Sequence, residues 1–274
     1  LLFSFIKSVG GQCRIYIPDR ITEGYGPNTS ALLDLARAGA SVVITVDCGT
    51  VAYEPLIAAA DAGIDVVVVD HHAAEDNLPP AVAVVNPNRL DDASGLGHLA
   101  AVGVVFLLVV AINRALRSSG WYAERKEPDL MCWLDLVALG TVCDVVPLRG
   151  LNRAFVTQGL KVLHRRENLG LRALTDVSAI NEPPTAYHLG FVLGPRINAG
   201  GRIGSADLGV RLLTAVAEDE AADLARRLNE LNRERQDIEQ GVLEEVMEKF
   251  AKKPLGPAVV AVGDNWHPGV IGIV

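Results

Sequence analysis

Two runs of β-branched apolar residues that end abruptly in polar side chains dominate the first third of the chain. The first run covers residues 42–46 and is followed by Asp47, and the second covers residues 66–69 and is followed by Asp70, His71 and His72. Buried parallel strands have this composition, and their carboxyl ends deliver polar residues to one edge of a sheet. The short helical pattern between the runs therefore predicts a strand, a crossover helix and a neighbouring parallel strand.

The rest of the pattern predicts an α/β order of elements. Alternating or continuous apolar positions predict further strands over residues 12–17 and 82–85. A helical period predicts helices over residues 1–7, 29–38, 99–116, 129–139, 152–163 and 169–177. Residues 219–250 form a charged stretch with one narrow apolar stripe, which predicts a helix of about 45 Å at about 1.5 Å per residue.

These elements predict an α/β fold with a mostly parallel sheet flanked by helices, a long linking helix and the start of a second α/β domain. The expected regions are a catalytic domain over residues 1–205, a helical region over 206–253, and the first elements of another domain over 254–274, beginning with a strand at 258–262. The first residues look like the second half of a helix, and the last ones stop within an apolar run. Both ends lead us to expect a fragment.

Composition narrows the class of function. The net charge of −8 argues against bulk electrostatic capture of nucleic acid, but not against a local basic groove. The four cysteines form no CxxC pair, which favours a reducing, cytoplasmic setting. The most apolar stretch, residues 99–112, is shorter than the roughly 20 residues of a membrane span, so we expect a buried core helix and no membrane association.

Four side chains suggest a metal site at the sheet edge: Asp47, His71, His72 and Asp144. Asp144 lies within the otherwise apolar residues 140–148, where a lone buried carboxylate is costly, so it either caps a segment or binds a cation. Carboxylates suit Mg²⁺ and Mn²⁺, and imidazole shifts the preference toward Mn²⁺. Two metals about 3.5 to 4 Å apart need a bridging carboxylate, and Asp47 is central enough to supply it.

Plainer interpretations compete with the metal site. A single Asp after a strand often caps the next helix, and adjacent histidines can be ordinary surface residues. The Asp-His-His run at the end of a neighbouring strand favours the metal site. No Ser occupies a nucleophile elbow, and no Walker-type loop or GxGxxG follows the first strand. The glycine- and arginine-rich residues 194–204 predict a loop, which either surrounds an anion or acts as a hinge.

Several motifs together resemble a known family. Residues 45–49 (Thr-Val-Asp-Cys-Gly), 70–72 (Asp-His-His) and 140–148 (Gly-Thr-Val-Cys-Asp-Val-Val-Pro-Leu) are similar to motifs of the DHH phosphoesterase superfamily. Residues 19–26, 99–106, 195–204 and 267–274 are similar to motifs of the RecJ family, which are single-strand-specific 5′ to 3′ DNA exonucleases. The resemblance spans nearly the whole chain.

The resemblance implies a role for each matched residue. Asp47 would bridge two Mn²⁺ or Mg²⁺ ions, and His71 and Asp144 would bind one of them. His72 would lie against the scissile phosphate, with Asp70 orienting the histidines. The residues expected to contact phosphate or the 5′ end of the strand are Arg196, Asn198 and Arg202. The implied partners are single-stranded DNA, a single-strand-binding protein and a helicase.

The chain departs from the family pattern at both ends. It contains no Asp-x-Asp-x-Asp-Gly motif, which supplies further metal ligands in the family, and no Gly-Gly-His motif of the C-terminal domain. We therefore expect these residues alone to bind metal poorly and to have little activity. Two alternatives stay open: another DHH phosphodiesterase acting on short RNA, cyclic dinucleotides or pyrophosphate, and a noncatalytic replication scaffold.

Positive charge is expected in two places. Five arginines near the candidate site could form a local groove: Arg165, Arg166, Arg172, Arg196 and Arg202. The arginines of the long helix are instead expected to form a solvated face, paired with neighbouring glutamates: Arg226, Arg227, Arg233 and Arg235.

Overall fold

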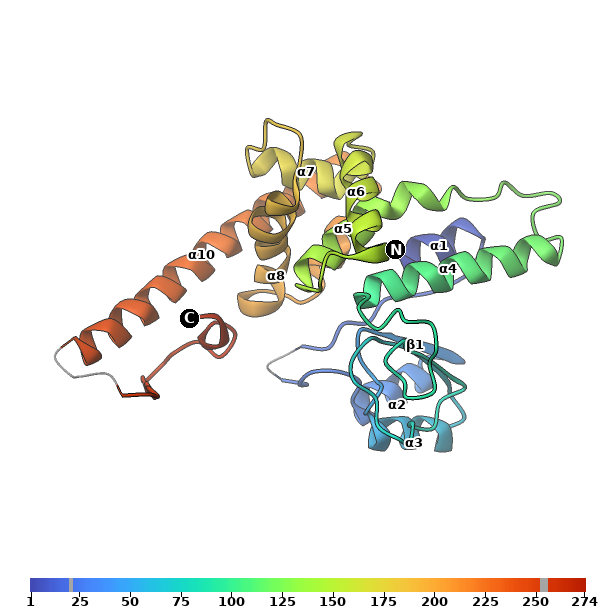
Figure 1. Ribbon diagram of the computed structural model, residues 1–274, viewed down its shortest axis with the longest axis horizontal. Helices are drawn as coiled ribbons and strands as arrows, with labels where there is room; N and C mark the ends of the chain where they lie inside the picture. The colour runs from blue at the N-terminus through green and yellow to red at the C-terminus, as the bar shows by residue number, and fades with distance from the viewer. Residues whose placement is uncertain (20–21, 252–255) are drawn as a thin grey trace. The chain divides into compact units, whose positions relative to one another are not determined.

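The computed structural model describes residues 1–19, 22–251 and 256–274, and the chain divides into two compact units (Figure 1). The first unit comprises Leu1–Pro18, Gly24–Glu167 and Glu182–Gly190. The second comprises Asp19–Glu23, Asn168–Asn181 and Phe191–Val274.

A three-stranded parallel sheet, in the order β1-β2-β3, forms the centre of the first unit. The strands are β1 (Val42–Val46), β2 (Asp65–Val69) and β3 (Ala83–Val85). Val46 pairs with Val69, and Val69 pairs with Val85, so the three strands finish at the same level. The residues that follow the strands therefore meet at one edge, as the sequence predicts for this α/β fold.

Helices cover both faces of the sheet. In β2 the side chains alternate, so that Val66 and Val68 face a core with α2 (Thr29–Arg37) and α3 (Tyr53–Asp61). Val69 faces a second core, which is built with α4 (Ala101–Ser118), α5 (Leu134–Cys143) and α6 (Gly150–His164). Two short helices, α1 (Leu2–Ser8) and η1 (Leu130–Trp133), complete the unit.

Helix α4 is long and apolar enough, by length and composition alone, to cross a membrane. Its inward face is nevertheless part of the second core, where Val109 is fully buried and Phe106 packs edge-on against Phe155 with ring centroids 5.4 Å apart. Core helices of soluble proteins pass the same length and hydropathy test. The packing agrees with the core helix that the sequence predicts.

The second unit is helical. Its helices are α7 (Leu169–Val177), α8 (Gly194–Ile203), α9 (Leu208–Thr214), α10 (Glu218–Phe250) and the short η3 (Ile271–Ile273), while the π-helical turn η2 (His188–Leu193) begins in the first unit. Helix α10 has 33 residues, about 50 Å at 1.5 Å per residue. Leu224, Leu228 and Leu231 are buried along it, which confirms the predicted apolar stripe.

Two expected strands are not formed. Residues 12–17 and 258–262 have no strand structure, although the first segment has an alternating pattern and the second is a continuous apolar run. A strand needs a neighbour for its backbone N–H and C=O groups. In the described part of the chain, β1 pairs with β2 along one of its edges. Within the same described residues, neither predicted segment pairs with the other edge of β1. The strand assignments for these two segments are therefore wrong.

The expected loop over residues 194–204 is also wrong, because Gly194–Ile203 form α8. Pro195 lies in the first turn, where its missing N–H costs nothing. A Cβ atom at Gly200 would lie 3.1 Å from the carbonyl oxygen of Ser205 and 3.2 Å from the Leu228 side chain. The glycine therefore permits close packing against α10 and does not indicate a flexible loop.

Candidate metal centre

The candidate site is built from the ends of β1 and β2 and the end of α5. The amide of Asp47 continues the ladder by donating to the Val69 carbonyl at 3.0 Å, and the amide of Asp70 donates to the Val85 carbonyl at 3.0 Å. Asp47 then adopts a left-handed conformation, with φ of 62°, which turns the chain away from the sheet. Asp144 is the residue that follows α5.

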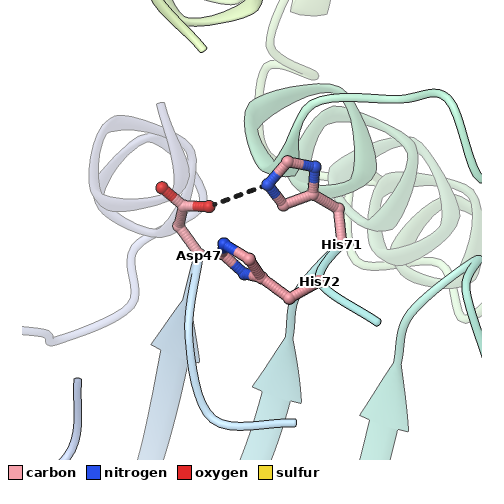
Figure 2. A group of neighbouring side chains, drawn as sticks. All are labelled: Asp47, His71 and His72. Atoms are coloured by element: carbon pink, nitrogen blue, oxygen red, sulfur yellow. Dashed lines mark ion pairs between the residues drawn. The ribbon is translucent and has the colours of Figure 1, made fainter. Parts of the chain in front are cut away.

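The structure brings Asp47, His71, His72 and Asp144 together in the first unit. Nε2 of His71 lies 3.3 Å from Oδ1 of Asp47 and 3.4 Å from Oδ2 of Asp144. Figure 2 shows Asp47 and His71 pointing toward each other, with the His72 ring beside them. One ligand atom from each of Asp47, His71 and His72 lies within 4.8 Å of the other two. Asp47 does not cap α3, whose first residue is preceded by Ala52.

His71 is oriented as a metal-ligating histidine would be. Its Nδ1 lies 3.0 Å from the carbonyl oxygen of Leu99, which fixes a proton on Nδ1 and directs Nε2 at the two carboxylates. Nε2 is buried and has no hydrogen-bond partner among the described residues. A buried nitrogen that faces two carboxylates without a hydrogen bond fits a position where a cation completes the interaction.

The charges of the cluster favour a cation. The carboxylate of Asp47, helped by Asp144 and opposed by burial, raises the pKa of His71 to about 8. Burial raises the pKa of Asp144, opposed by the charge of His71 and helped by that of Asp47. Burial raises the pKa of the adjacent Cys48 thiol to about 11, so at neutral pH this thiol is not a thiolate ligand.

Asp70 lies behind the histidines and holds them in place. Its Oδ1 accepts from Nδ1 of His72 at 2.7 Å and from the His71 amide at 2.8 Å. Its Oδ2 accepts from the hydroxyl of Thr50 at 2.7 Å and from the Thr50 amide at 3.1 Å. Burial opposes ionisation of Asp70, but these hydrogen bonds together hold its pKa below the ordinary value. Asp70 is 1% exposed, so it acts on the histidines and not on solvent.

Two asparagines that follow β3 also support the site, and the sequence reasoning missed them. Nδ2 of Asn86 donates to the Thr50 hydroxyl at 2.8 Å and to the His72 carbonyl at 2.9 Å. Nδ2 of Asn88 donates to the His71 carbonyl at 2.5 Å. The signal that could have found them is the one used for β1 and β2: polar residues that directly follow a parallel strand at the same edge.

Three predicted substrate-binding residues belong to α8, in the second unit. Nε of Arg196 donates to Asn229 at 3.0 Å, its Nη1 donates to the Val192 carbonyl at 2.7 Å, and burial lowers its pKa. Nη1 of Arg202 donates to the Gly269 carbonyl at 3.1 Å, and Asn198 is exposed. The contact of these residues with a substrate stays a prediction.

Comparison with known proteins agrees with the geometry. A family model described as "DHH family, N-terminal domain" matches residues 1–141, which is just over half of the chain. The chain belongs to the DHH family. The matched region contains β1, β2 and β3, and with them Asp47, His71 and His72, whereas Asp144 lies just beyond it.

Proteins similar to this DHH chain include single-stranded-DNA-specific exonucleases named RecJ. The RecJ of Dickeya dadantii is 41% identical over 98% of this chain and 48% of its own length, and that of Bacillus subtilis is 38% identical over 98% and 33%. The chain therefore spans less than half the length of these relatives. A manganese-bound exonuclease RecJ has a TM-score of 0.86 at 32% identity, covering 99% of this chain and 66% of that one.

A second solved structure, the RecJ of Thermus thermophilus in complex with Mn²⁺, has a TM-score of 0.83 at 30% identity. It covers 99% of this chain and 38% of that one. The likeness to both structures extends through the helices of the second unit, and confirms the α/β fold with a parallel sheet and flanking helices.

Proposed function

We propose that the protein is a metal-dependent exonuclease that hydrolyses single-stranded DNA from the 5′ end to mononucleotides. The observation that carries the proposal is the placement of His71, whose buried Nε2 faces the carboxylates of Asp47 and Asp144 while Nδ1 is held by Leu99. The likeness to single-stranded-DNA-specific exonucleases, and to RecJ structures with Mn²⁺ and with Mg²⁺, supports the substrate and the metal.

Asp47, His71 and Asp144 are the residues that would hold Mn²⁺ or Mg²⁺ here, with Asp47 as the carboxylate shared between two ions. Bound divalent ions lower the pKa of water and neutralise charge on a phosphodiester. His72 has its Nδ1 fixed on Asp70, and half of its side chain is exposed, so its Nε2 is available to a phosphate oxygen. We assign the positioning of His72 to Asp70.

Arg196, Asn198 and Arg202 would contact phosphate or the 5′ end of the strand. The guanidinium of Arg196 is half-buried and held from two sides, so it loses little conformational freedom on binding an anion. The regions expected from the sequence, residues 1–205, 206–253 and 254–274, stay proposals about the domains of the whole protein. A single-strand-binding protein, a helicase and a cytoplasmic location likewise stay proposals.

The test is digestion of 5′-labelled and 3′-labelled single strands by the full-length protein in Mn²⁺. We expect labelled mononucleotides to appear first from the 5′ label, with duplex DNA resistant and chelation by EDTA abolishing the release. His71→Ala should lower the rate by at least a hundredfold, whereas Asp34→Asn, an exposed carboxylate paired with Arg37, should not change it. Hydrolysis of cyclic dinucleotides or short RNA in preference to DNA would instead identify another DHH phosphodiesterase.

A further inference from the structure

The solvent-exposed face of α6 carries a row of positive charges. Four cationic residues define this face: Arg149 and Arg165, which flank the helix, and Arg153 and Lys161, which lie within it. Each is four or eight residues from the next, with Thr157 at the middle position, and because four residues turn a helix about 40° past a full turn, the row winds across the solvent-exposed half of α6. All four are exposed, and the row extends over about 24 Å at 1.5 Å per residue. We call these four residues the α6 cationic face.

This face lacks the acidic partners that arginines of α10 have. Helix α6 contains no Asp or Glu, although the whole chain has a net charge of −8. None of the four cationic residues forms an ion pair within the described ranges. On α10, by contrast, Arg226 pairs with Asp223 and Arg227 pairs with Glu230. An ordinary solvated face has the pattern of α10, and the α6 cationic face does not.

The packing of α6 fixes the cationic face toward solvent. Its opposite side buries Phe155, Val156, Gly159 and Val162. A Cβ atom at Gly159 would lie 2.1 Å from the carbonyl oxygen of Leu134, so α6 lies against the backbone of α5 at this point. Rotation of α6 would bring a side chain into that contact. The orientation of the charges is therefore set by the core.

The first turn of α6 is joined to the metal centre by hydrogen bonds. Nδ2 of the fully buried Asn152 donates to the His98 carbonyl at 2.6 Å and to the Pro147 carbonyl at 3.1 Å. The residue after His98, Leu99, is the one whose carbonyl holds Nδ1 of His71. The α6 cationic face therefore starts near His98 and Leu99, the segment that holds His71, and leads away from it along α6.

We propose that the α6 cationic face binds the phosphate backbone of a nucleic-acid strand whose end lies in the metal centre. This inference rests on the proposed function and adds a path for the strand in the first unit. The four positions offer charge at intervals of about one or two helical turns, without an apolar or aromatic group among them. A polyanion with regularly repeated charge matches them, and the binding is independent of base sequence because no base is recognised.

The test compares binding of a fluorescent oligothymidylate to the full-length protein in EDTA over a range of salt concentrations. The variant is Arg153→Gln with Lys161→Gln, and the matched control is Arg226→Gln with Arg227→Gln, which removes the same charge from α10. Since single strands lose about 0.7 in the salt slope per phosphate contact, the variant should lower the slope by about 1.4 and weaken binding at low salt roughly tenfold. The control should keep the slope of the unaltered protein.

Hydrolysis of a thymidine dinucleotide separates this inference from the proposed function. A dinucleotide is too short to follow the helix, so the α6 variant should hydrolyse it at the normal rate while losing activity on long strands. If the unaltered protein hydrolyses neither, the proposed function is wrong, and the binding comparison still decides the role of α6. An unchanged salt slope in the α6 variant, or a loss seen equally in the control, overturns the inference. The inference is also overturned if the α6 variant loses its binding to an acidic peptide such as polyglutamate but keeps its binding to DNA.

Discussion

The hydroxyl of Thr50 donates a hydrogen bond of 2.7 Å to Oδ2 of Asp70, which lies twenty residues further along the chain and follows the neighbouring strand. The direction of this bond is fixed, because Nδ2 of Asn86 donates to the same hydroxyl oxygen at 2.8 Å. The other oxygen of Asp70 meets Nδ1 of His72 at 2.7 Å. A chain of donors from Asn86 through Thr50 to Asp70 therefore keeps the proton of His72 on Nδ1.

Replacing Thr50 by Val should remove the hydrogen bond to Asp70 that helps to keep the proton of His72 on Nδ1, without changing the volume of the buried side chain. We expect kcat on single-stranded DNA to fall by about tenfold, the lower end of what the loss of an outer partner of a metal site costs, with little change in KM. Thr50→Ser keeps the hydroxyl and should restore most of the rate. ¹⁵N NMR of the histidine rings supplies an independent measurement, in which Val but not Ser should mix the two tautomers of His72. An equal rate for Val and Ser would contradict the role of the hydroxyl.

Metal affinity should depend on Asp144. Asp144→Asn keeps the size of the side chain but removes a charge 3.4 Å from Nε2 of His71. We expect the dissociation constant for Mn²⁺ to rise by at least tenfold, because hard divalent cations prefer charged carboxylate ligands. Free Mn²⁺ measured by electron paramagnetic resonance gives this constant directly. Asp92→Asn, on an exposed carboxylate bonded to Ser94, is the control and should bind Mn²⁺ normally.

The part of the fold that the sequence predicts best is the sheet edge. Period and composition alone locate β1, β2 and α3, and parallel pairing then requires Asp47 and His71 to be neighbours. Asp144 is different. The sequence predicts that Asp144 is either a metal ligand or a cap. Its position at the end of α5 is what brings the Asp144 carboxylate close to His71.

The wrong predictions from the sequence have one physical origin. A local pattern of residues does not specify which other part of the chain will pack against it or form hydrogen bonds with it. Residues 12–17 alternate like a strand, but no described strand pairs with them. Gly200 looks like part of a loop, but it is a helical position where another helix comes close. Thr50 and Asn86 were missed for the same reason. Thr50 supports the site through its hydrogen bond to Asp70, and Asn86 supports it through its hydrogen bond to Thr50.

Two glycines in helices should respond oppositely to alanine. Gly159 of α6 has no room, because a Cβ atom would lie 2.1 Å from the Leu134 carbonyl oxygen and 2.5 Å from Cβ of Ala138. Gly241 of α10 has no atom within 4 Å of that position. Gly159→Ala should lower the free energy of unfolding by about 1 to 3 kcal/mol through overpacking. Gly241→Ala should raise it by about 0.5 to 1 kcal/mol through helix propensity.

Urea denaturation of the two variants and the unaltered protein measures both changes. Each substitution adds the same methyl group to a helix, so the pair separates the packing of α6 on α5 from helix propensity. If Gly159→Ala were as stable as Gly241→Ala, the close approach of α6 to α5 would be contradicted, and with it the fixed orientation of the α6 cationic face.

Stability should also depend on pH through Asp135, a carboxyl of α5 that is 3% exposed. Burial raises its pKa from 3.8 to about 6, against the opposing hydrogen bond from the Leu136 amide. Between these two pKa values the folded state binds more protons than the unfolded state, so the free energy of unfolding falls as the pH rises through this window. The loss is complete above pH 6 and absent below pH 4.

Asp135→Asn removes this titration and keeps an oxygen to accept from the Leu136 amide at the position where Oδ1 accepts at 2.7 Å. The difference in unfolding free energy between the variant and the unaltered protein should therefore grow in favour of the variant from pH 4 to pH 7. A shift of about two pKa units corresponds to about 3 kcal/mol at most. Denaturation curves at pH 4, 5, 6 and 7 measure it, and all other titrating groups cancel in the difference. A difference that stays constant over this range would show that Asp135 titrates normally and that its site is open to water.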